Sequence, residues 1–371
     1  MSKGLAIIYD PHNLYQFVWY YCNQGRKKRW DALSLPNGYK GEYMHSYCER
    51  AGIFEEIYYD NDDFSTLNAR EKCKQFSQMF FFFLVRRQKD YCKKLLNHYI
   101  KLDQYDEIVV IADVGMVSGA CVALGEEKKI VILEDGINDY GDRSRLISRE
   151  KIFSTYSWQG MILSHMGYCS PGWFRFDADR YCIKYCSQID KMKYRDYKEM
   201  RQLYSSEGTD QELFNQLLYK MYPMLRLYQF QTAEAILITR PLEDFVGDTD
   251  KYKRRLEKYV NEHYSSVIVK KHPREDSEYE FEDRVYVQEI DNSIPVEVML
   301  PYLKGKDIVI VTTSSVMLYL KAYSLKCKVI VFDGLYEESI NTNSQFRPLD
   351  LKATIGFAEE FAEDCYEIVQ I

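Results

Sequence analysis

Residues 107–136 read EIVVIADVGMVSGACVALGEEKKIVILEDG. Two short runs rich in Val and Ile, 107–112 and 129–133, are separated by a small-residue segment that is long enough for a helix. An apolar run of this length that is bounded by turn residues is typical of a strand buried on both faces. The stretch therefore predicts a strand, a helix and a second, parallel strand, which is the repeating unit of an α/β domain.

Similar apolar runs recur in both halves of the 371-residue chain, which is longer than one hydrophobic core usually holds. We therefore expect two α/β domains, residues 1–230 with a helical insertion at 141–230, and residues 231–371. We also expect the last helix to pack back on the first domain. Two facing Rossmann-like domains of this kind form the GT-B architecture. The further runs lie at 5–9, 235–239, 266–270, 308–311 and 329–332.

The overall charge and the cysteines argue against several classes of protein. The net charge is −7, from 49 Lys and Arg against 56 Asp and Glu, whereas a general nucleic-acid binder carries a basic excess. The ten cysteines are scattered, and the closest pair, Cys182 and Cys186, has no matching second pair. We therefore expect a reduced protein without a metal site. The first ten residues are too short for a secretory segment, so we expect a cytoplasmic protein.

Polar clusters follow four of the expected strands. Because ligands of open α/β sheets bind at the carboxyl ends of the strands, this shared placement marks the clusters as candidate sites. It is stronger evidence than any one cluster alone. The clusters are Asp113, Glu134-Asp135-Gly136, Lys271-His272-Pro273-Arg274 and Thr313-Ser314-Ser315.

The first half of the chain offers a candidate base. A carboxylate such as that of Asp135, held at the mouth of a cleft, can take a proton from an acceptor hydroxyl, and Gly136 permits a tight bend after it. Asp113 is a second candidate of the same kind. The alternative for both positions is an ordinary turn.

The second half offers candidate phosphate ligands. His272 can donate to a phosphate oxygen, Pro273 holds it in an extended backbone, and Lys271 and Arg274 add positive potential. The alternative is a surface charge cluster.

Two further elements of the second half fit a nucleotide. Ser314 and Ser315, after Thr313, stand at an expected helix start, where an anion is favoured; plain N-capping is the alternative. Glu297 interrupts an apolar segment, so it needs a partner such as a ribose diol, unless it is a solvent-facing residue of a first turn.

Taken in order, these motifs resemble bacterial sialyltransferases of glycosyltransferase family 52, which include lipooligosaccharide and capsule enzymes. A looser resemblance extends to other bacterial sialyltransferases with Asp-Asp-Gly, His-Pro and Ser-Ser motifs. Glu134 departs from the acidic pair, residues 10–13 fit loosely, and 141–230 gives no match. The segments that carry the resemblance are Leu133–Gly136, Ile236–Leu242, Lys271–Arg274, Ser293–Val298 and Thr313–Ser315.

The resemblance implies a role for each matching residue. Asp135 is the general base, and His272 contacts the CMP phosphate and acts as general acid on the leaving group. Glu297 binds the cytidine-ribose side, and Ser314 and Ser315 hold the phosphate. Lys270 or Arg274 would neutralise the sugar carboxylate.

The expected protein is an inverting, metal-independent sialyltransferase without a cofactor. Its partners would be CMP-sialic acid and a glycan acceptor, a lipooligosaccharide or capsular saccharide. The alternatives are a CMP-Kdo or CDP-glycerol-dependent transferase of similar fold, and a non-catalytic nucleotide- or glycan-binding protein. Basic segments at 26–29 and 251–258 leave open an association with the inner face of the cytoplasmic membrane, against plain surface charge. A homodimer is also left open.

Overall fold

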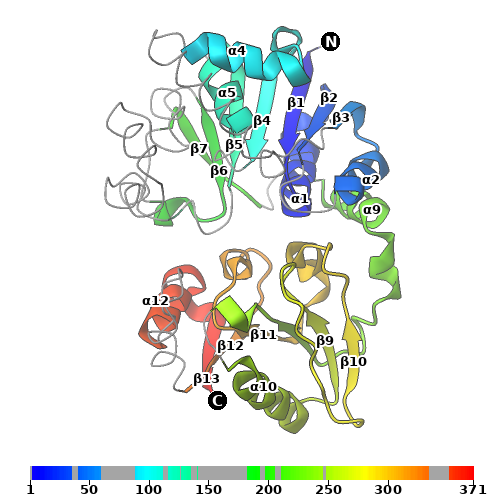
Figure 1. The fold of residues 1–371 in the computed structure, drawn as a ribbon, viewed down its shortest axis with the longest axis vertical. Coiled ribbons are helices and arrows are strands. Elements are labelled where there is room, and N and C mark those ends of the chain that lie inside the picture. The colour runs from blue at the N-terminus through cyan, green and yellow to red at the C-terminus, as the bar shows by residue number, and fades with distance from the viewer. Residues whose placement is uncertain are drawn as a thin grey trace. The chain divides into compact units, whose positions relative to one another are not determined.

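The chain divides into two compact units, Met1–Met221 and Tyr222–Ile371, in the computed structural model (Figure 1). The structure describes residues 2–35, 41–59, 88–111, 116–125, 127–134, 140, 182–192, 197–204, 210–244, 248–333 and 351–371.

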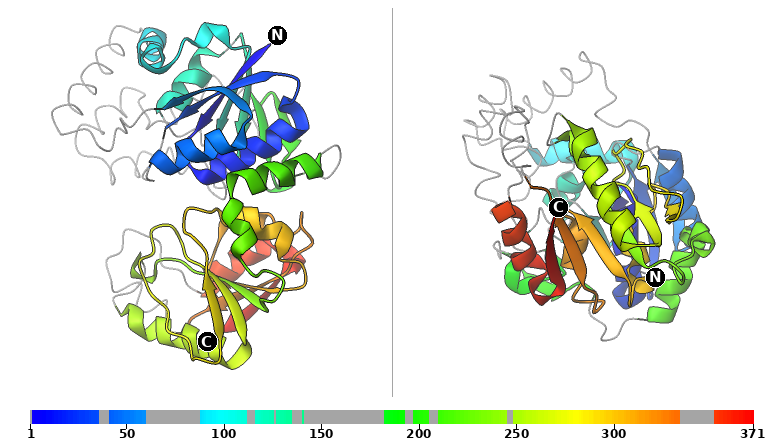
Figure 2. Two further views of the ribbon diagram at one scale, coloured as in Figure 1. Left: turned by 90° about the vertical axis from the view of Figure 1, so that its right-hand side faces the viewer. Right: turned by 90° about the horizontal axis from the view of Figure 1, so that it is seen from below.

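The first unit is built on a seven-stranded parallel sheet in the order β3-β2-β1-β4-β5-β6-β7. Crossovers between parallel strands are right-handed, and the chain runs from β1 to β2 in one direction along the sheet and from β4 to β5 in the other. The crossover helices α1 and α5 therefore fall on opposite faces. Helices α1, α2 and α9 lie side by side (Figure 2), and α4 lies against α5. The strands are β1 Lys3–Ile8, β2 Arg29–Ser34, β3 Phe54–Tyr59, β4 Glu107–Ile111, β5 Lys129–Leu133, β6 Ile183–Cys186 and β7 Glu199–Gln202. The helices are α1 Pro11–Tyr20, α2 Gly41–Ala51, α4 Gln88–Tyr99, α5 Met116–Leu124 and α9 Gln211–Met221.

The second unit repeats this plan with a six-stranded parallel sheet in the order β10-β9-β8-β11-β12-β13. In both sheets the order of strands reverses beside the first strand, between β1 and β4 and between β8 and β11, and such a reversal is where α/β sheets bind ligands. The strands are β8 Ala235–Ile238, β9 Ser266–Lys270, β10 Tyr286–Glu289, β11 Asp307–Val311, β12 Cys327–Val331 and β13 Tyr366–Gln370. The helices are α10 Thr249–His263 and α12 Leu351–Phe361, with 3-10 turns η7 Pro223–Leu227, η8 Leu242–Asp244, η9 Val296–Tyr302, η10 Ser315–Leu318 and η11 Glu363–Cys365.

Local sequence explains why these elements form. Asp248 caps α10 by accepting a hydrogen bond from the Lys251 amide at 3.2 Å, and Tyr252, Leu256 and Val260 then recur on one face of the helix. This face packs on β8, β9 and β11 in one buried cluster. In the first unit Gly4 of β1 faces the ring of Trp30 so closely that a Cβ there would lie 2.4 Å from a ring carbon.

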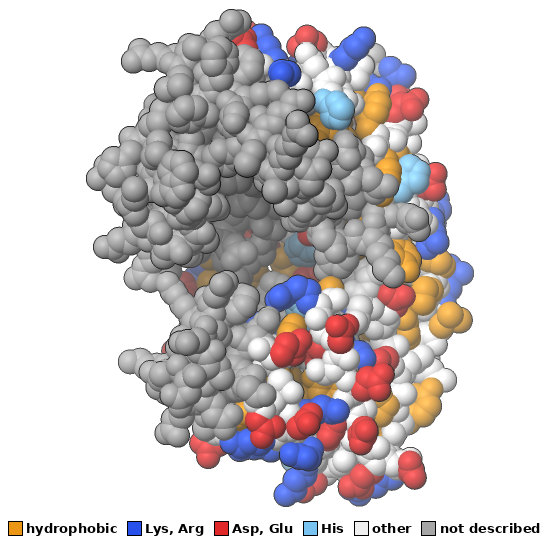
Figure 3. Space-filling model, in the orientation of Figure 1, with side chains coloured by type: hydrophobic (Ala, Val, Ile, Leu, Met, Phe, Trp, Pro, Cys, Tyr) orange, Lys and Arg blue, Asp and Glu red, His pale blue; other side chains and the backbone are white. Residues whose placement is uncertain are grey.

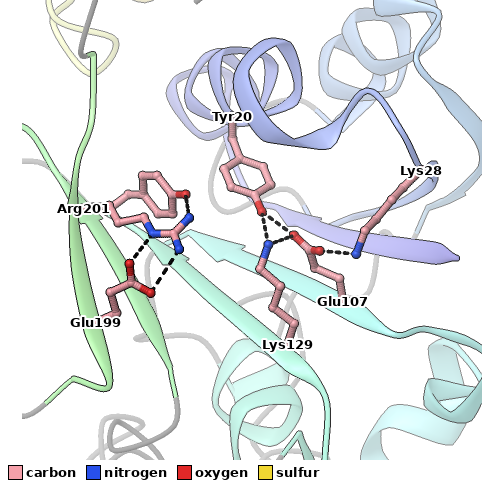
Figure 4. Close-up of polar contacts among 7 residues, drawn as sticks. Tyr20, Lys28, Glu107, Lys129, Glu199 and Arg201 are labelled. Atoms are coloured by element: carbon pink, nitrogen blue, oxygen red, sulfur yellow. Dashed lines mark hydrogen bonds and ion pairs between the residues drawn. The ribbon is translucent and has the colours of Figure 1, made fainter. Parts of the chain in front are cut away.

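The amino ends of both sheets carry the same polar group, an acid, a lysine and a tyrosine. In the first unit Glu107 begins β4 and accepts hydrogen bonds from Lys28, from Tyr20 of α1 and, at 3.1 Å, from Lys129 of β5 (Figure 4). Arg201 of β7 pairs with Glu199 beside them. In the second unit, Asp307 begins β11 and accepts from Lys328 of β12 and, at 3.0 Å, from Tyr264, the C-cap of α10. Each lysine lies over its tyrosine ring, at 5.9 Å from the Tyr20 centroid and 5.6 Å from that of Tyr264.

The strands expected from apolar runs are confirmed. Strands β2, β6, β7 and β13 were missed because their patterns are mixed. Lys184 of β6, for example, is buried and donates to the Leu133 carbonyl at 3.1 Å. The helical insertion expected at 141–230 has α9 in its later part, but residues 183–186 and 199–202 are strands of the first sheet. The helix that was expected to start at Ser314 and Ser315 is only the short turn η10.

The start of the second unit also differs from expectation. Residues 227–229, which we had placed in the first domain, bond to the edge of the second sheet, where the Gln229 amide donates to Gln288 at 2.9 Å and Gln288 donates to the Leu227 carbonyl at 3.3 Å. The last helix, α12, lies against β12 and η10 of its own unit. Among the described helices, none has the length and apolar character that crossing a bilayer would need. Figure 3 shows acidic and basic side chains interspersed over the visible face of the second unit.

Candidate active site

The loops after β8 and β11 meet where the strand order of the second sheet reverses. The two strands are paired directly, and Arg240 of the first loop bridges to the second. Its Nη1 donates to Thr313 Oγ1 at 2.6 Å and lies 3.3 Å from Thr312 Oγ1 and 3.4 Å from the Thr313 carbonyl oxygen. A half-buried guanidinium thus stands at the position where this fold class binds anions. Arg240 lies in the segment 236–242 that carries the family resemblance, but the sequence predicted no role for it, although it follows a buried strand like the other candidates.

The loop after β11 presents the three hydroxyls expected from the sequence. Ser314 is the N-cap of η10, with its Oγ accepting from the Val316 amide at 3.3 Å, so the capping interpretation is correct for this residue. Thr313, Ser314 and Ser315 are half-buried. Thr312, before them, is buried and has φ 63°, a left-handed conformation that is strained for a β-branched residue. Such strain clusters at functional sites.

His272 lies in a tight turn at the carboxyl end of β9. Its carbonyl accepts from the Glu275 amide at 2.9 Å, and the exposed Pro273 and Arg274 form the tip of the turn. The Arg274 amide donates to Nδ1 of His272 at 3.2 Å. Because Nδ1 is an acceptor in this assignment, the neutral imidazole carries its proton on Nε2. The ring is therefore set up as an Nε2–H donor.

Glu275, for which the sequence predicted no role, holds this turn by hydrogen bonds. It is 2% exposed and accepts from Thr239 Oγ1 at 2.6 Å, from the His272 amide at 3.3 Å and from the Tyr279 hydroxyl. Burial, together with the charge of Glu275, raises the pKa of Tyr279, so the hydroxyl stays protonated and donates. One carboxylate thus ties the loops after β8 and β9 together.

The neighbouring lysines are engaged within their own unit. Lys270 is buried, and its ammonium donates to the carbonyls of Lys271 at 2.7 Å and Asn292 at 3.3 Å. Burial lowers its pKa to about 8, against the opposing charges of Glu297, Asp291 and Glu275. These contacts do not favour Lys270 as a counter-ion for a sugar carboxylate. Lys271 pairs with Glu289 at 2.9 Å.

Glu297 stands in the first turn of η9 and is 4% exposed. The alternative of a solvent-facing first-turn glutamate is therefore wrong. Its charge is one of those that raise the pKa of the buried Lys270, which places the two groups near one another.

In the first unit, Asp135 and Gly136 lie outside the described residues, as does Asp113. The residue before Asp135, Glu134, is fully buried at the end of β5. It accepts from the Tyr140 hydroxyl at 2.6 Å and from the Ser187 amide at 2.7 Å, and Ser187 Oγ donates to its other oxygen. The start of the Asp135 loop is thereby tied to the end of β6.

A second polar corner lies at the carboxyl end of β1, in the segment 10–13. Asp10 caps α1 by accepting from the Asn13 amide at 2.8 Å, and Asn13 in turn accepts from the Tyr9 amide at 3.1 Å. The Tyr9 hydroxyl lies 2.8 Å from Ser118 Oγ of α5. This corner stands at the strand-order reversal of the first sheet.

The arrangement in the second unit can bind and stabilise an anion. Arg240, the His272 imidazole and the hydroxyls after β11 stand at the ends of three neighbouring strands, β9, β8 and β11. Preorganised donors of this kind stabilise negative charge as it develops on a leaving group. In the part of the chain that the structure describes, no group of three or more His, Cys, Asp or Glu side chains could hold a metal ion.

Comparison with solved structures shows the fold. The chain matches the glycotransferase of kitacinnamycin with a TM-score of 0.50 and 11% identity, over 100% of this chain and 86% of that one. It matches MurG of Acinetobacter baumannii with a TM-score of 0.43 and 10% identity, again over 100% and 86%. The expected GT-B class is confirmed. No curated protein sequence matches the chain.

Comparison with protein families shows the family. The model of the family described as alpha-2,8-polysialyltransferase matches residues 53–332, which is more than half of the chain. The resemblance to bacterial sialyltransferases is confirmed at this level, whereas family 52 is not the family that the match names. The chain is thus a glycosyltransferase of the GT-B fold that belongs to the alpha-2,8-polysialyltransferase family.

Proposed function

We propose that the protein is an inverting, metal-independent sialyltransferase that transfers sialic acid from CMP-sialic acid to a glycan acceptor, a lipooligosaccharide or capsular saccharide, in the cytoplasm. The observation that carries this proposal is the set of anion donors at the ends of β8, β9 and β11, in which Arg240 bridges two loops and His272 presents Nε2–H. The match to the alpha-2,8-polysialyltransferase family supports sialic acid as the sugar that is transferred.

The proposed reaction is a single displacement. Asp135 takes the proton of the acceptor hydroxyl, whose oxygen attacks the anomeric carbon of the sugar. The bond from that carbon to the phosphate oxygen breaks, and CMP leaves with the electron pair. His272, Ser314, Ser315 and Arg240 donate hydrogen bonds to the departing phosphate. A single displacement of this kind inverts the anomeric centre.

The geometry refines the role of His272. A ring whose Nδ1 accepts from the Arg274 amide is neutral, and it acts on the phosphate as a hydrogen-bond donor from Nε2. Full proton transfer would require an imidazolium, whose Nδ1–H would oppose the Arg274 N–H. Glu297 is proposed to bind the ribose hydroxyls, with Lys271, Pro273, Arg274 and Thr313 shaping the donor pocket and Gly136 bending the loop of the base.

Turnover of the donor tests the proposal. The wild type is expected to release CMP from CMP-sialic acid with a glycan acceptor, in the presence of EDTA, and NMR should show the inverted anomer first. Asp135→Ala should lower kcat by about 10²–10⁴, and His272→Ala by about 10²–10³, the effect of losing one donor to a developing anion.

Two outcomes would contradict it. Faster turnover of CMP-Kdo or CDP-glycerol would assign a different donor. Tight CMP binding without transfer to any acceptor in a panel of lipooligosaccharide and capsular fragments would favour the non-catalytic alternative.

A further inference from the structure

Glu275 is a buried acid that accepts hydrogen bonds from the loop after β8 and from residues on both sides of it in the loop after β9. Its Oε2 accepts from both Thr239 Oγ1 at 2.6 Å and the His272 amide at 3.3 Å, whereas its Oε1 accepts from Tyr279. No ion pair of Glu275 is found among the described residues, although it lies in the field of Lys270. This carboxylate therefore does not neutralise a cationic side chain by direct pairing.

The contact with the His272 amide determines the shape of the turn. The turn from His272 to Glu275 is closed twice, once by the Glu275 amide on the His272 carbonyl at 2.9 Å and once by the Glu275 carboxylate on the His272 amide. Closure at both points holds the amide of Arg274, at the tip, toward the imidazole. That amide then donates to Nδ1 at 3.2 Å, and the ring proton is on Nε2.

We propose that Glu275 is a positioning residue for the transferase reaction, which holds the turn that fixes His272 as its Nε2–H tautomer. This inference rests on the proposed function, because it assigns to that tautomer the hydrogen bond to the departing phosphate. Glu275 acts through His272 and does not touch the donor. Thr239, which directly precedes Arg240 in the loop after β8, donates to the same carboxylate. Glu275 therefore holds the loop of Arg240 as well as the loop of His272.

The test compares three substitutions. Glu275→Met removes the acceptor of the His272 amide at similar length, and Glu275→Gln keeps one carbonyl oxygen for it. Tyr279→Phe leaves that acceptor in place and removes the donor on the opposite oxygen, together with the contact of the Tyr279 hydroxyl with Thr239. The chain has six histidines, so selective ¹⁵N labelling, with His272→Gln to assign its signal, reports the protonation of each ring nitrogen. The turnover number and KM for CMP-sialic acid are measured on the same samples.

We expect Glu275→Met to lose the defined Nε2–H signature and about tenfold or more in kcat, with a smaller change in KM, as for misplacement of a catalytic group. Glu275→Gln should restore most of both. Tyr279→Phe should lower the melting temperature but leave the tautomer and kcat near those of the wild type. If Glu275→Met does not fold, Glu275→Asp, which withdraws the carboxylate by one methylene, is expected to give the same loss.

A wild-type tautomer in folded Glu275→Met or Glu275→Asp would overturn the inference, and so would an equal loss of kcat in Tyr279→Phe. The NMR measurement needs no turnover. A wild type that binds CMP but transfers nothing would therefore refute the proposed function, while the tautomer of each variant would still decide the role of Glu275.

Discussion

Glu107 at the amino end of β4 and Glu275 beyond the carboxyl end of β9 are buried to nearly the same extent, at 1% and 2% exposure. Glu107 accepts from two lysines and a tyrosine (Figure 4), whereas the donors to Glu275 are two hydroxyls and a backbone amide. Burial by itself raises the pKa of Glu107, but the hydrogen bonds from Lys28 and Tyr20 and the charge of Lys129 bring it below its ordinary value. Glu107 thus joins strands, and Glu275 shapes a loop.

The difference shows that the amino ends of the strands contribute stability, whereas the carboxyl ends carry the candidate catalytic residues. Opposite charges at the amino ends offset the desolvation of a buried acid and hold β4 and β5 in register. At the carboxyl ends, Glu275 and Glu134 accept from hydroxyls and amides of neighbouring loops. Each of these two acids is close in sequence to a candidate catalytic residue, Glu275 to His272 and Glu134 to Asp135. The two ends can be separated by substitution.

The largest expected effect comes from breaking the amino-end cluster. Glu107→Ala should lower the free energy of unfolding by about 3 kcal/mol, the low end for a broken buried pair, because both lysines are partly exposed and can reach water. The turnover number of the folded fraction should not change. Chemical denaturation and donor turnover on the same sample check this.

The pH dependence of the same substitution has a definite sign. Since the folded pKa of Glu107 is below its ordinary 4.5, its contribution is complete above that value and is lost as the pH falls through the folded pKa. The wild type should therefore lose more stability on acidification than Glu107→Ala. Equal losses would contradict the lowered pKa of Glu107. A fall in kcat of Glu107→Ala at neutral pH would show that the two ends of the unit are not separable.

Arg240→Met should have the next largest effect, on binding at the carboxyl ends. Loss of hydrogen bonds from a charged donor costs about 1.5–3 kcal/mol, which corresponds to about 10–100-fold weaker binding of CMP. Arg240→Lys should recover only part of this, because Nη1 alone makes the contacts with Thr312 and Thr313, and an ammonium lacks the other N–H groups of the guanidinium that can bind the phosphate. Calorimetric titration measures both variants.

Cytidine is the matched control for Arg240. Because the proposed contact is with the phosphate, cytidine should bind Arg240→Met and the wild type equally. An equal loss for cytidine and CMP would mean that the substitution distorts the loops rather than removing a phosphate contact.

The smallest expected effect comes from Asp307, which stands at the amino end of the second sheet in the same arrangement as Glu107 but is 41% exposed. Asp307→Asn should lower the free energy of unfolding by about 0.2–1 kcal/mol, the usual range for an exposed ion pair. Salt should reduce the difference further. A loss as large as that of Glu107→Ala would contradict the view that burial, and not the acid-lysine-tyrosine arrangement, sets the size of the effect.

Much of the fold could be predicted because parallel strands buried on both faces are written as continuous apolar runs, as in 107–112 and 308–311. Strands with a different pattern were not predicted. β6 carries a buried lysine, and β13 is an edge strand without a fully buried residue. Of the site, the sequence predicted the His272 loop and the hydroxyls of 313–315, since each follows a strand. It gave no sign of Glu275, which follows His272 among several charged residues.

The amino-acid sequence by itself determined two series of alternating strands and helices, the family resemblance and the positions of the polar loops, because these depend on neighbours along the chain. Only the tertiary structure decided which loops share a hydrogen-bond network. Arg240 and Thr313 are 73 residues apart, and Thr239 and Glu275 are 36 apart, yet each pair is in contact. The physical reason is that pairing of parallel strands brings their carboxyl ends to one edge, where side chains from distant segments complete each other's hydrogen bonds.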